Sequence, residues 1–88
     1  MDKEEIRKEL YALLDEKFCV SDDELRGGSA QVCTDLGLDS LDVIELVEYF
    51  ENKHNISIPD SDAAGVADMT VDQLVDFVCE AVTKYKKA

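Results

Sequence analysis

The residues of this sequence that are best suited to chemistry are one serine and the carboxylates that follow it. Ser40 stands between Asp39 and Leu41, within the segment TDLGLDSLDVIELVEYF from Thr34 to Phe50. Acidic residues then recur at steps of three positions, at Asp42, Glu45, Glu48 and Glu51. A serine hydroxyl can cap a helix, act as a nucleophile or accept a covalent modification, and the neighbouring positions help to separate these roles.

Two residues compete to cap the helix that begins here. With Asp39 as N-cap the residue at position N3 is the acidic Asp42, whereas with Ser40 as N-cap it is Val43. Because an acidic N3 side chain can bond back to the N-cap amide, Asp39 is the better cap. The Ser40 hydroxyl then stands at N1, beside free backbone N–H groups at the positive end of a helix. Such a position suits an attached phosphate group.

The helix predicted from about Ser40 to His54 has two unlike faces. Positions spaced at 100° gather one apolar cluster that should face the core, with His54 at its edge: Val43, Leu46, Val47 and Phe50. Leu41 and Ile44 fall instead among the carboxylates, on the side expected to face solvent. Isolated exposed leucines and solvated runs of charge are common in proteins. Beside a serine that is not needed for capping, we nevertheless interpret this face as functional.

Two further helices are expected. Asp2 and Glu5 start one that runs to about Lys17 with apolar residues at helical spacing, and Thr70 with Gln73 forms a capping box before the last helix. Between Phe18 and Asp39 we expect a long loop with a short helical turn near Ser21, held to the core by Leu25, Val32, Leu36 and Leu38. After Pro59 we expect one helical turn.

Three amphipathic helices, each with a face to bury, predict an all-α four-helix bundle with one short member. We expect the 88 residues to form a single domain, 1–88, and a domain of this size has little room for an enclosed active site. Cys19, Cys33 and Cys79 are widely spaced without a CxxC pair, and we interpret them as small buried apolar residues. No metal site is predicted.

The charge balance limits the possible partners. Twenty-one acidic against nine basic residues give a formal charge of −12, which disfavours nucleic acid and anionic membranes and favours partners with basic patches. The sequence contains no signal-peptide pattern and no apolar run of membrane-spanning length. We therefore expect a cytoplasmic monomer that does not insert stably into membranes.

The segment DLGLDSLDVIELVEYFENKHNISIPD, from Asp35 to Asp60, resembles the acyl carrier proteins. DSL alone is a weak signature, but DLGLDSLDVIEL followed at the right distance by ISIPD is a specific one. The resemblance is close over this segment and agrees in helix order over nearly the whole chain. It implies the four-helix fold of that family.

The resemblance also implies a function for this serine and its helix. Ser40 would carry covalent 4′-phosphopantetheine through a phosphodiester, and the thiol of this arm would hold acyl groups as thioesters in fatty acid, polyketide or related specialised lipid biosynthesis. The chain would be a non-catalytic carrier modified by a phosphopantetheinyl transferase (holo-acyl-carrier-protein synthase) and used by acyl-transfer and acyl-processing enzymes with basic patches. The residues implied in docking them are Asp39, Leu41, Asp42, Ile44, Glu45 and Glu48.

An acyl chain would need shelter inside the bundle, and the candidates for lining such a cavity are Leu46, Val47, Phe50, Ile58, Val66 and Leu74. The sequence departs from the family pattern at Glu48, where fatty-acid carriers usually have an apolar docking residue, and at His54, where an apolar or aromatic residue is common. The stretch from Pro59 to Val71 is about two residues longer than usual. These departures favour a specialised carrier.

Three other interpretations each fit part of the sequence. A serine hydrolase needs a base near Ser40, but the only histidine, His54, lies 14 residues along the same helix, about 21 Å away at 1.5 Å per residue. DSDAAG, from Asp60 to Gly65, begins like a calcium loop, yet the position for a bidentate glutamate holds Val71, which leaves at most weak ion binding. An unmodified acidic adaptor that uses the same helix remains an alternative.

Overall fold

Five α-helices and two short 3-10 helices follow one another in residues 3–86, the part of the chain that the computed structural model describes. Their order is α1 (Lys3–Phe18), α2 (Asp22–Leu25), η1 (Arg26–Gly28), α3 (Ser40–His54), α4 (Asp60–Ala63), η2 (Ala64–Asp68) and α5 (Val71–Lys84). The predicted bounds of α1, α3 and α5 are confirmed to within a residue or two. Asp2, expected to help start α1, lies outside the described residues.

Local capping chemistry sets where α5 and α3 begin or end. At the start of α5 the Thr70 hydroxyl accepts a hydrogen bond from the Gln73 amide at 3.2 Å, and the Thr70 amide donates to Gln73 Oε1 at 2.9 Å. This is the predicted capping box. At the end of α3, Asn55 adopts a left-handed conformation with φ 54°, and its N–H bonds to the Glu51 carbonyl. The polypeptide therefore leaves α3 at the point that the sequence predicted.

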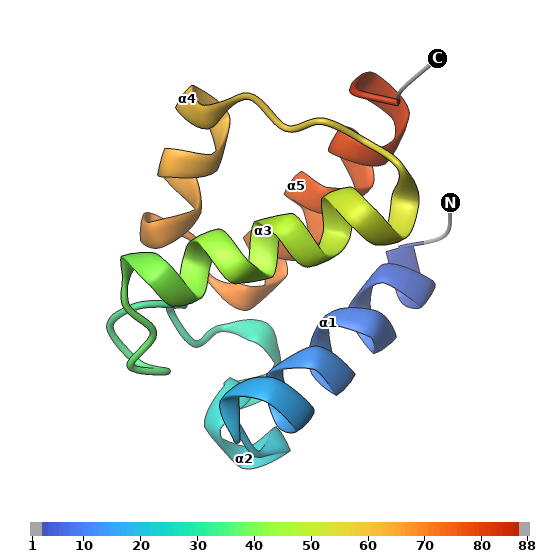
Figure 1. Ribbon diagram of the computed structural model, residues 1–88. Coiled ribbons are helices and arrows are strands. Elements are labelled where there is room, and N and C mark those ends of the chain that lie inside the picture. Colours follow the sequence, from blue (N-terminus) through green and yellow to red (C-terminus); the bar gives the residue numbers. More distant parts are fainter. Residues whose placement is uncertain (1–2, 87–88) are drawn as a thin grey trace.

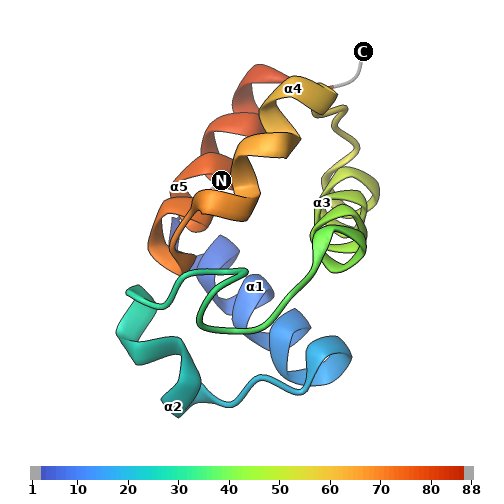
Figure 2. The ribbon, with the colours of Figure 1, turned by 90° about the vertical axis from the view of Figure 1, so that its left-hand side faces the viewer.

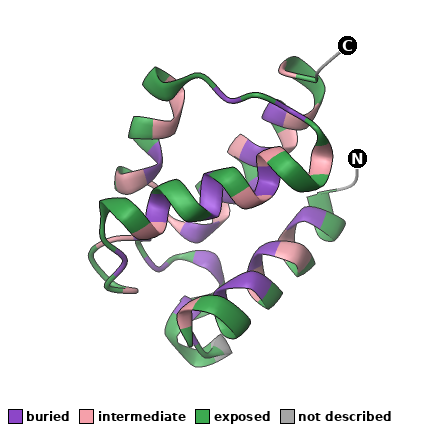
Figure 3. Cartoon of the chain, in the orientation of Figure 1, coloured by how far each residue is buried: buried purple, intermediate pink, exposed green. Residues whose placement is uncertain are grey.

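The helices form the predicted bundle, in which α1, α3 and α5 are the long members and the short member is α4 continued by η2 (Figures 1 and 2). Helices α1 and α5 pack against each other, and η2 contacts α3. Figure 3 shows that buried positions recur along the inner faces of α1, α3 and α5. Fully buried residues from these three helices and the segments between them form one core; the largest include Ile6, Leu10, Leu14, Leu25, Leu46, Phe50, Ile56 and Leu74.

The long connection between α1 and α3 is held to the bundle as expected. The Val32 amide donates to the Met69 carbonyl at 3.0 Å, and the Val71 amide donates to the Ala30 carbonyl at 2.9 Å. These bonds tie the connection to the residues that start α5. The side chains of Leu25, Val32 and Leu38 are buried and Leu36 is half-buried, so the predicted anchors are confirmed. The short helical turn expected near Ser21 is α2.

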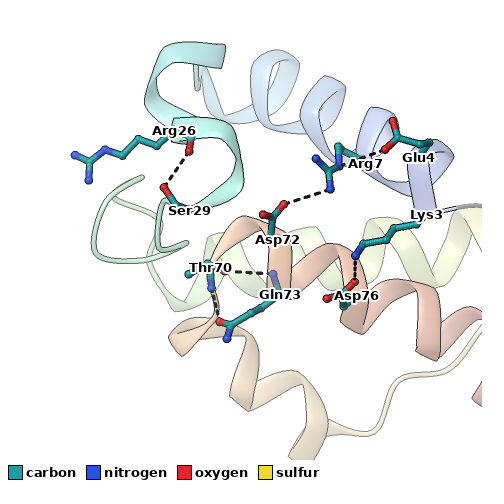
Figure 4. A network of polar contacts seen from close by, with 9 residues as sticks. All are labelled: Lys3, Glu4, Arg7, Arg26, Ser29, Thr70, Asp72, Gln73 and Asp76. Atoms are coloured by element: carbon teal, nitrogen blue, oxygen red, sulfur yellow. Dashed lines mark hydrogen bonds and ion pairs between the residues drawn. The ribbon is translucent and has the colours of Figure 1, made fainter.

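A polar network on the outside of the bundle joins α1 to α5 (Figure 4). Lys3 Nζ lies 2.6 Å from Asp76 Oδ1, and Arg7 Nη2 lies 3.5 Å from Asp72 Oδ1. Gly28, at φ +100°, packs directly under Asp72, because a Cβ added to it would lie 2.2 Å from Asp72 Oδ1. Exposed ion pairs of this kind contribute roughly 0–1 kcal/mol each, so most of the stability comes from the core.

Two expectations from the sequence differ from the structure. The segment after Pro59 forms more than the single expected turn, since η2 continues directly from α4 through Asp68. The interpretation of all three cysteines as buried is wrong: Cys19 is exposed, and Cys33 and Cys79 are half-buried, and none of the three forms a disulfide within residues 3–86. Cys19 follows the last residue of α1 at φ 56°, so it belongs to the turn that ends the helix and not to its apolar face.

Candidate modification site, docking face and groove

Ser40 is the first residue of α3, and its side chain is exposed. The capping of α3 is done by its neighbour: Asp39 Oδ1 accepts from the Asp42 amide at 2.9 Å, and Asp42 Oδ2 accepts from the Asp39 amide at 3.3 Å. This reciprocal box is the one predicted from the sequence. Within residues 3–86 the Ser40 hydroxyl forms no hydrogen bond, so it is free to react.

The residues present fit a phosphate ester on this hydroxyl. Ser40 and Leu41 stand in the first turn of a 15-residue helix, where backbone N–H groups have no intrahelical acceptor. The helix dipole adds positive potential at this end. The Asp39 carboxylate accepts the cap bond from the Asp42 amide, and the Ser40 side chain beside it is exposed. An exposed, uncommitted hydroxyl at a helix N-terminus is what a bound phosphodiester requires.

The outward face of α3 beside Ser40 combines exposed apolar side chains with carboxylates. Leu41 is 68% exposed and Ile44 is 51% exposed, and these are the large apolar side chains that stand out on the described surface. Among the surrounding acids, Asp39, Glu45 and Glu48 are exposed and Asp42 is half-buried. None of these four acids takes part in an ion pair within residues 3–86. We call Leu41, Ile44 and these four carboxylates the docking face.

A groove of about 540 Å³ runs between α3 and the short helices α4 and η2, and it opens beside Ser40. The residues that line it on α3 are Ser40, Val43, Ile44, Val47, Glu48 and Glu51, which occupy successive turns of one helix face. The opposite wall and the far end are made by Ile58, Asp60, Ala63, Ala64 and Ala67. The three alanines leave space because their side chains end at Cβ.

Only part of the residue set proposed from the sequence for an acyl cavity lines this groove. Val47 and Ile58 do, and both are buried. Leu46, Phe50, Val66 and Leu74 are almost completely buried in the closed core and do not border the groove. An acyl chain could reach those four only if the helices moved apart, so their role in binding such a chain stays a prediction.

Cys33 lies in the loop that precedes α3, close enough to the site to feel its charges. The pKa of the Cys33 thiol is raised, first by its partial burial and then by the nearby carboxylates of Asp68, Asp39 and Asp42. A higher pKa means less thiolate at neutral pH, and thiolate is the reactive form. Cys33 is therefore a poor nucleophile, partly because it shares the negative potential of the site.

His54 is at the edge of the core, as expected, but it also has a specific partner. Its Nε2 lies 2.7 Å from Glu9 Oε1, with 8% of the histidine side chain exposed, and its ring stacks on Phe50 at a centroid distance of 6.1 Å. Lys53 Nζ adds a contact to the other Glu9 oxygen at 3.8 Å. His54 thus links the end of α3 to α1 and takes no part in the Ser40 site.

The segment that begins like a calcium loop is helical. Asp60 and Asp62 occupy the first turn of α4, and Asp62 accepts a hydrogen bond from the hydroxyl of Tyr85, the residue after α5. Within residues 3–86, no three histidine, cysteine or acidic side chains are grouped so that they could hold a metal ion.

The sequence pattern does not reveal the alanine wall of the groove or the carboxylates that line it. Sequence spacing groups Glu51 with the acids that follow Ser40, whereas in the structure its Oε2 also accepts a hydrogen bond from the Ile58 amide at 2.8 Å and the residue lines the groove. A helical wheel could have placed Glu51 below Val47, since the two are four residues apart. It could not have shown that Asp60 and the alanines lie opposite.

Comparison with known proteins connects this geometry to a family. The family model described as "phosphopantetheine attachment site" matches residues 8–78. The chain is 37% identical over 78 residues to the acyl carrier protein of Chlorobium luteolum, covering 89% of this chain and 96% of that protein. It is 38% identical over 78 residues to that of Prochlorococcus marinus, covering 89% and 94%, and 34% identical over 80 residues to that of Chloroherpeton thalassium, covering 91% and 96%.

Proposed function

Because the chain belongs to the acyl carrier protein family, whose domain is the attachment site of phosphopantetheine, we propose that Ser40 carries the 4′-phosphopantetheine arm and that acyl groups travel on its thiol. The observation that supports this most directly is that Ser40 is not needed to cap α3. The Asp39 and Asp42 carboxylates complete the cap, and the exposed Ser40 hydroxyl is left without a partner.

The protein contributes position and charge to this function, and its partner enzymes contribute the catalysis. Ser40 Oγ would attack the coenzyme A phosphorus that bears the pantetheine group when a transferase brings the two together. The pyrophosphate bond of coenzyme A would break, adenosine 3′,5′-bisphosphate would leave, and the hydroxyl proton would be lost. The arm supplies a thiol that can hold an acyl group as a thioester. The residues near Ser40 orient the modified serine at the mouth of the groove and present the docking face to whichever enzyme binds.

The docking face is suited to enzymes that carry basic patches. Its acids have no cationic partner within residues 3–86, so their field is available to steer a partner toward Ser40. Leu41 and Ile44, set among these acids, supply apolar contact that becomes desolvated on docking. We propose as partners a phosphopantetheinyl transferase and acyl-transfer or acyl-processing enzymes. We further propose that the carrier is a monomer and that it works in the cytoplasm. Within residues 3–86 no helix has both the length and the apolar character needed to cross a bilayer.

Mass spectrometry tests the proposal. The purified chain is incubated with coenzyme A and a phosphopantetheinyl transferase, and the intact mass and the mass of each proteolytic peptide are measured. The proposal predicts that the chain gains one arm and that the added mass maps to the peptide that contains Ser40. If the chain gains no mass, or if the mass maps elsewhere, the carrier function at Ser40 is rejected in favour of an unmodified acidic adaptor.

A further inference from the structure

The groove beside Ser40 changes character along its length. At the end next to the serine its α3 wall presents Val43, Ile44 and Val47, all apolar. Farther along α3 it presents Glu48 and Glu51, and Asp60 of α4 also lines the groove. From Ser40 to Glu51 the α3 wall rises by eleven residue steps, or about 16.5 Å at 1.5 Å per residue. A chain lying in this groove would therefore meet apolar surface first and carboxylates afterwards.

The three carboxylates that line the groove, Glu48, Glu51 and Asp60, have no cationic partner in the part of the chain that the structure describes. The ion pairs of residues 3–86 use the acids Glu4, Glu9, Asp35, Asp72 and Asp76, and no lysine or arginine lines the groove. Glu51 accepts one hydrogen bond, from the Ile58 amide, but this bond leaves its charge uncompensated. The groove is thus lined by three of the twenty-one acidic residues that give the protein its net charge of −12.

An uncharged alkyl chain that filled the groove would be poorly matched to this end. Glu48 and Asp60 are exposed and Glu51 is half-buried, so such a chain would displace only part of the water around the carboxylates. It would offer them neither a hydrogen bond nor an opposite charge in return, and removing water from a charged group has a cost that grows with burial. A chain ending in an ammonium group would replace that water with charge-assisted hydrogen bonds, the stronger kind. The apolar wall near Ser40 would still pack against its methylene groups.

Building on the proposed function, we propose that the groove favours acyl groups that carry a positively charged amine at their far end over alkyl chains of equal length. In this arrangement Val43, Val47 and Ile58 contact the methylene part, and Glu48, Glu51 and Asp60 receive the ammonium. The discrimination belongs to the carrier itself and acts before any partner enzyme binds. Amino-bearing acyl thioesters would be the class of cargo that the bundle protects best.

The test compares three arms that differ only at the tip. Coenzyme A thioethers bearing hexyl, 6-hydroxyhexyl and 6-aminohexyl groups are loaded onto the full chain by a phosphopantetheinyl transferase, and loading is verified by intact mass. Backbone amide NMR shifts and melting temperature are then recorded for each form. We expect the aminohexyl form to show the largest amide shifts at Glu48, Glu51 and Asp60 and the highest melting temperature of the three.

A pair of matched variants separates the groove from the general charge of the protein. Glu48→Gln combined with Asp60→Asn removes two charges from the groove, and Asp15→Asn combined with Glu16→Gln removes two exposed charges from α1. The advantage of the aminohexyl arm should be lost in the first pair and kept in the second. If the groove pair proves poorly folded, Glu48→Gln alone, on the exposed rim, provides the same comparison.

The other outcomes contradict the proposal in distinguishable ways. Equal shifts and melting temperatures for the hexyl and aminohexyl forms would show that the far end does not select charge, and an equal effect of the hydroxyhexyl arm would show that hydrogen bonding suffices. If the aminohexyl form also lost its advantage in the Asp15→Asn, Glu16→Gln variant, the effect would be a nonspecific attraction between the ammonium group and the overall charge of the protein. A chain that gains no arm at Ser40 would overturn the proposed function, and this inference with it.

Discussion

Asp39 and Asp42 bond to each other's backbone amides across the first turn of α3, at 2.9 and 3.3 Å, and Ser40 lies between them without taking part. Capping the helix and accepting a modification, which a single serine could do together, therefore belong to different residues. The helix end is stabilised by the carboxylates, so the hydroxyl can be modified without unravelling α3. This separation makes stability and modification independently testable.

Removing the cap should destabilise the protein. Asp39→Ala takes away the acceptor for the Asp42 amide and should lower the free energy of unfolding by about 1 kcal/mol, the usual cost of losing an N-cap. Urea unfolding followed by circular dichroism measures this change. Glu16→Ala, an exposed position within α1, is the control and should change stability by less than about 0.5 kcal/mol. Equal stability of Asp39→Ala and wild type would show that Asp39 is not the cap.

The charged and apolar parts of the docking face should separate kinetically. Glu45→Lys should slow association with the transferase mainly at low ionic strength, because steering by exposed charge is screened by salt. Leu41→Ala and Ile44→Ala should weaken the complex by about 1–2 kcal/mol each at every salt concentration, since they remove desolvated contacts. Binding rates measured against salt for the three variants test this division.

Thermal melts of the same variants supply the control. Leu41 and Ile44 are exposed, so replacing either with alanine should leave the isolated protein nearly as stable as wild type. Should these substitutions unfold the protein while the folded fraction still docks normally, the docking face would have to lie elsewhere on the surface.

The thiol of Cys33 should resist alkylation more than its partial exposure suggests. Its pKa is raised by burial and by neighbouring carboxylates, so at a given pH near neutrality less of it is thiolate, and its reaction with iodoacetamide should be slower. The midpoint of its pH–rate profile should lie at higher pH in the folded protein than in urea, which distinguishes a pKa effect from simple occlusion. Peptide mass spectrometry measures the rate at each cysteine. A folded-state midpoint equal to that in urea would reject the account.

Much of the fold could be predicted because its signals are local. The Thr70–Gln73 box, the Asp39–Asp42 box and the left-handed Asn55 depend on residues within a few positions of each other, and the apolar face of α3 follows from helical spacing. The exposure of Leu41 and Ile44 was predicted from the same wheel and is confirmed. What the wheel could not show is the depth to which each inward residue is buried.

The parts that could not be predicted depend on contacts between distant segments. The groove exists because Ala63, Ala64 and Ala67 lie opposite α3, and nothing within either segment specifies that pairing. The same holds for the contact of His54 with Glu9, which are 45 positions apart. Cys19 was misjudged because cysteine is usually buried, whereas here it occupies the turn after α1.

The most direct test of the central claim is the mass of Ser40→Ala after incubation with transferase and coenzyme A, beside wild type and Ser57→Ala, a second exposed serine. We predict that wild type and Ser57→Ala gain the arm, that Ser40→Ala gains nothing, and that Ser40→Ala unfolds within about 0.5 kcal/mol of wild type because Asp39 still caps α3. A Ser40→Ala chain that still acquires the mass of the arm would contradict the account.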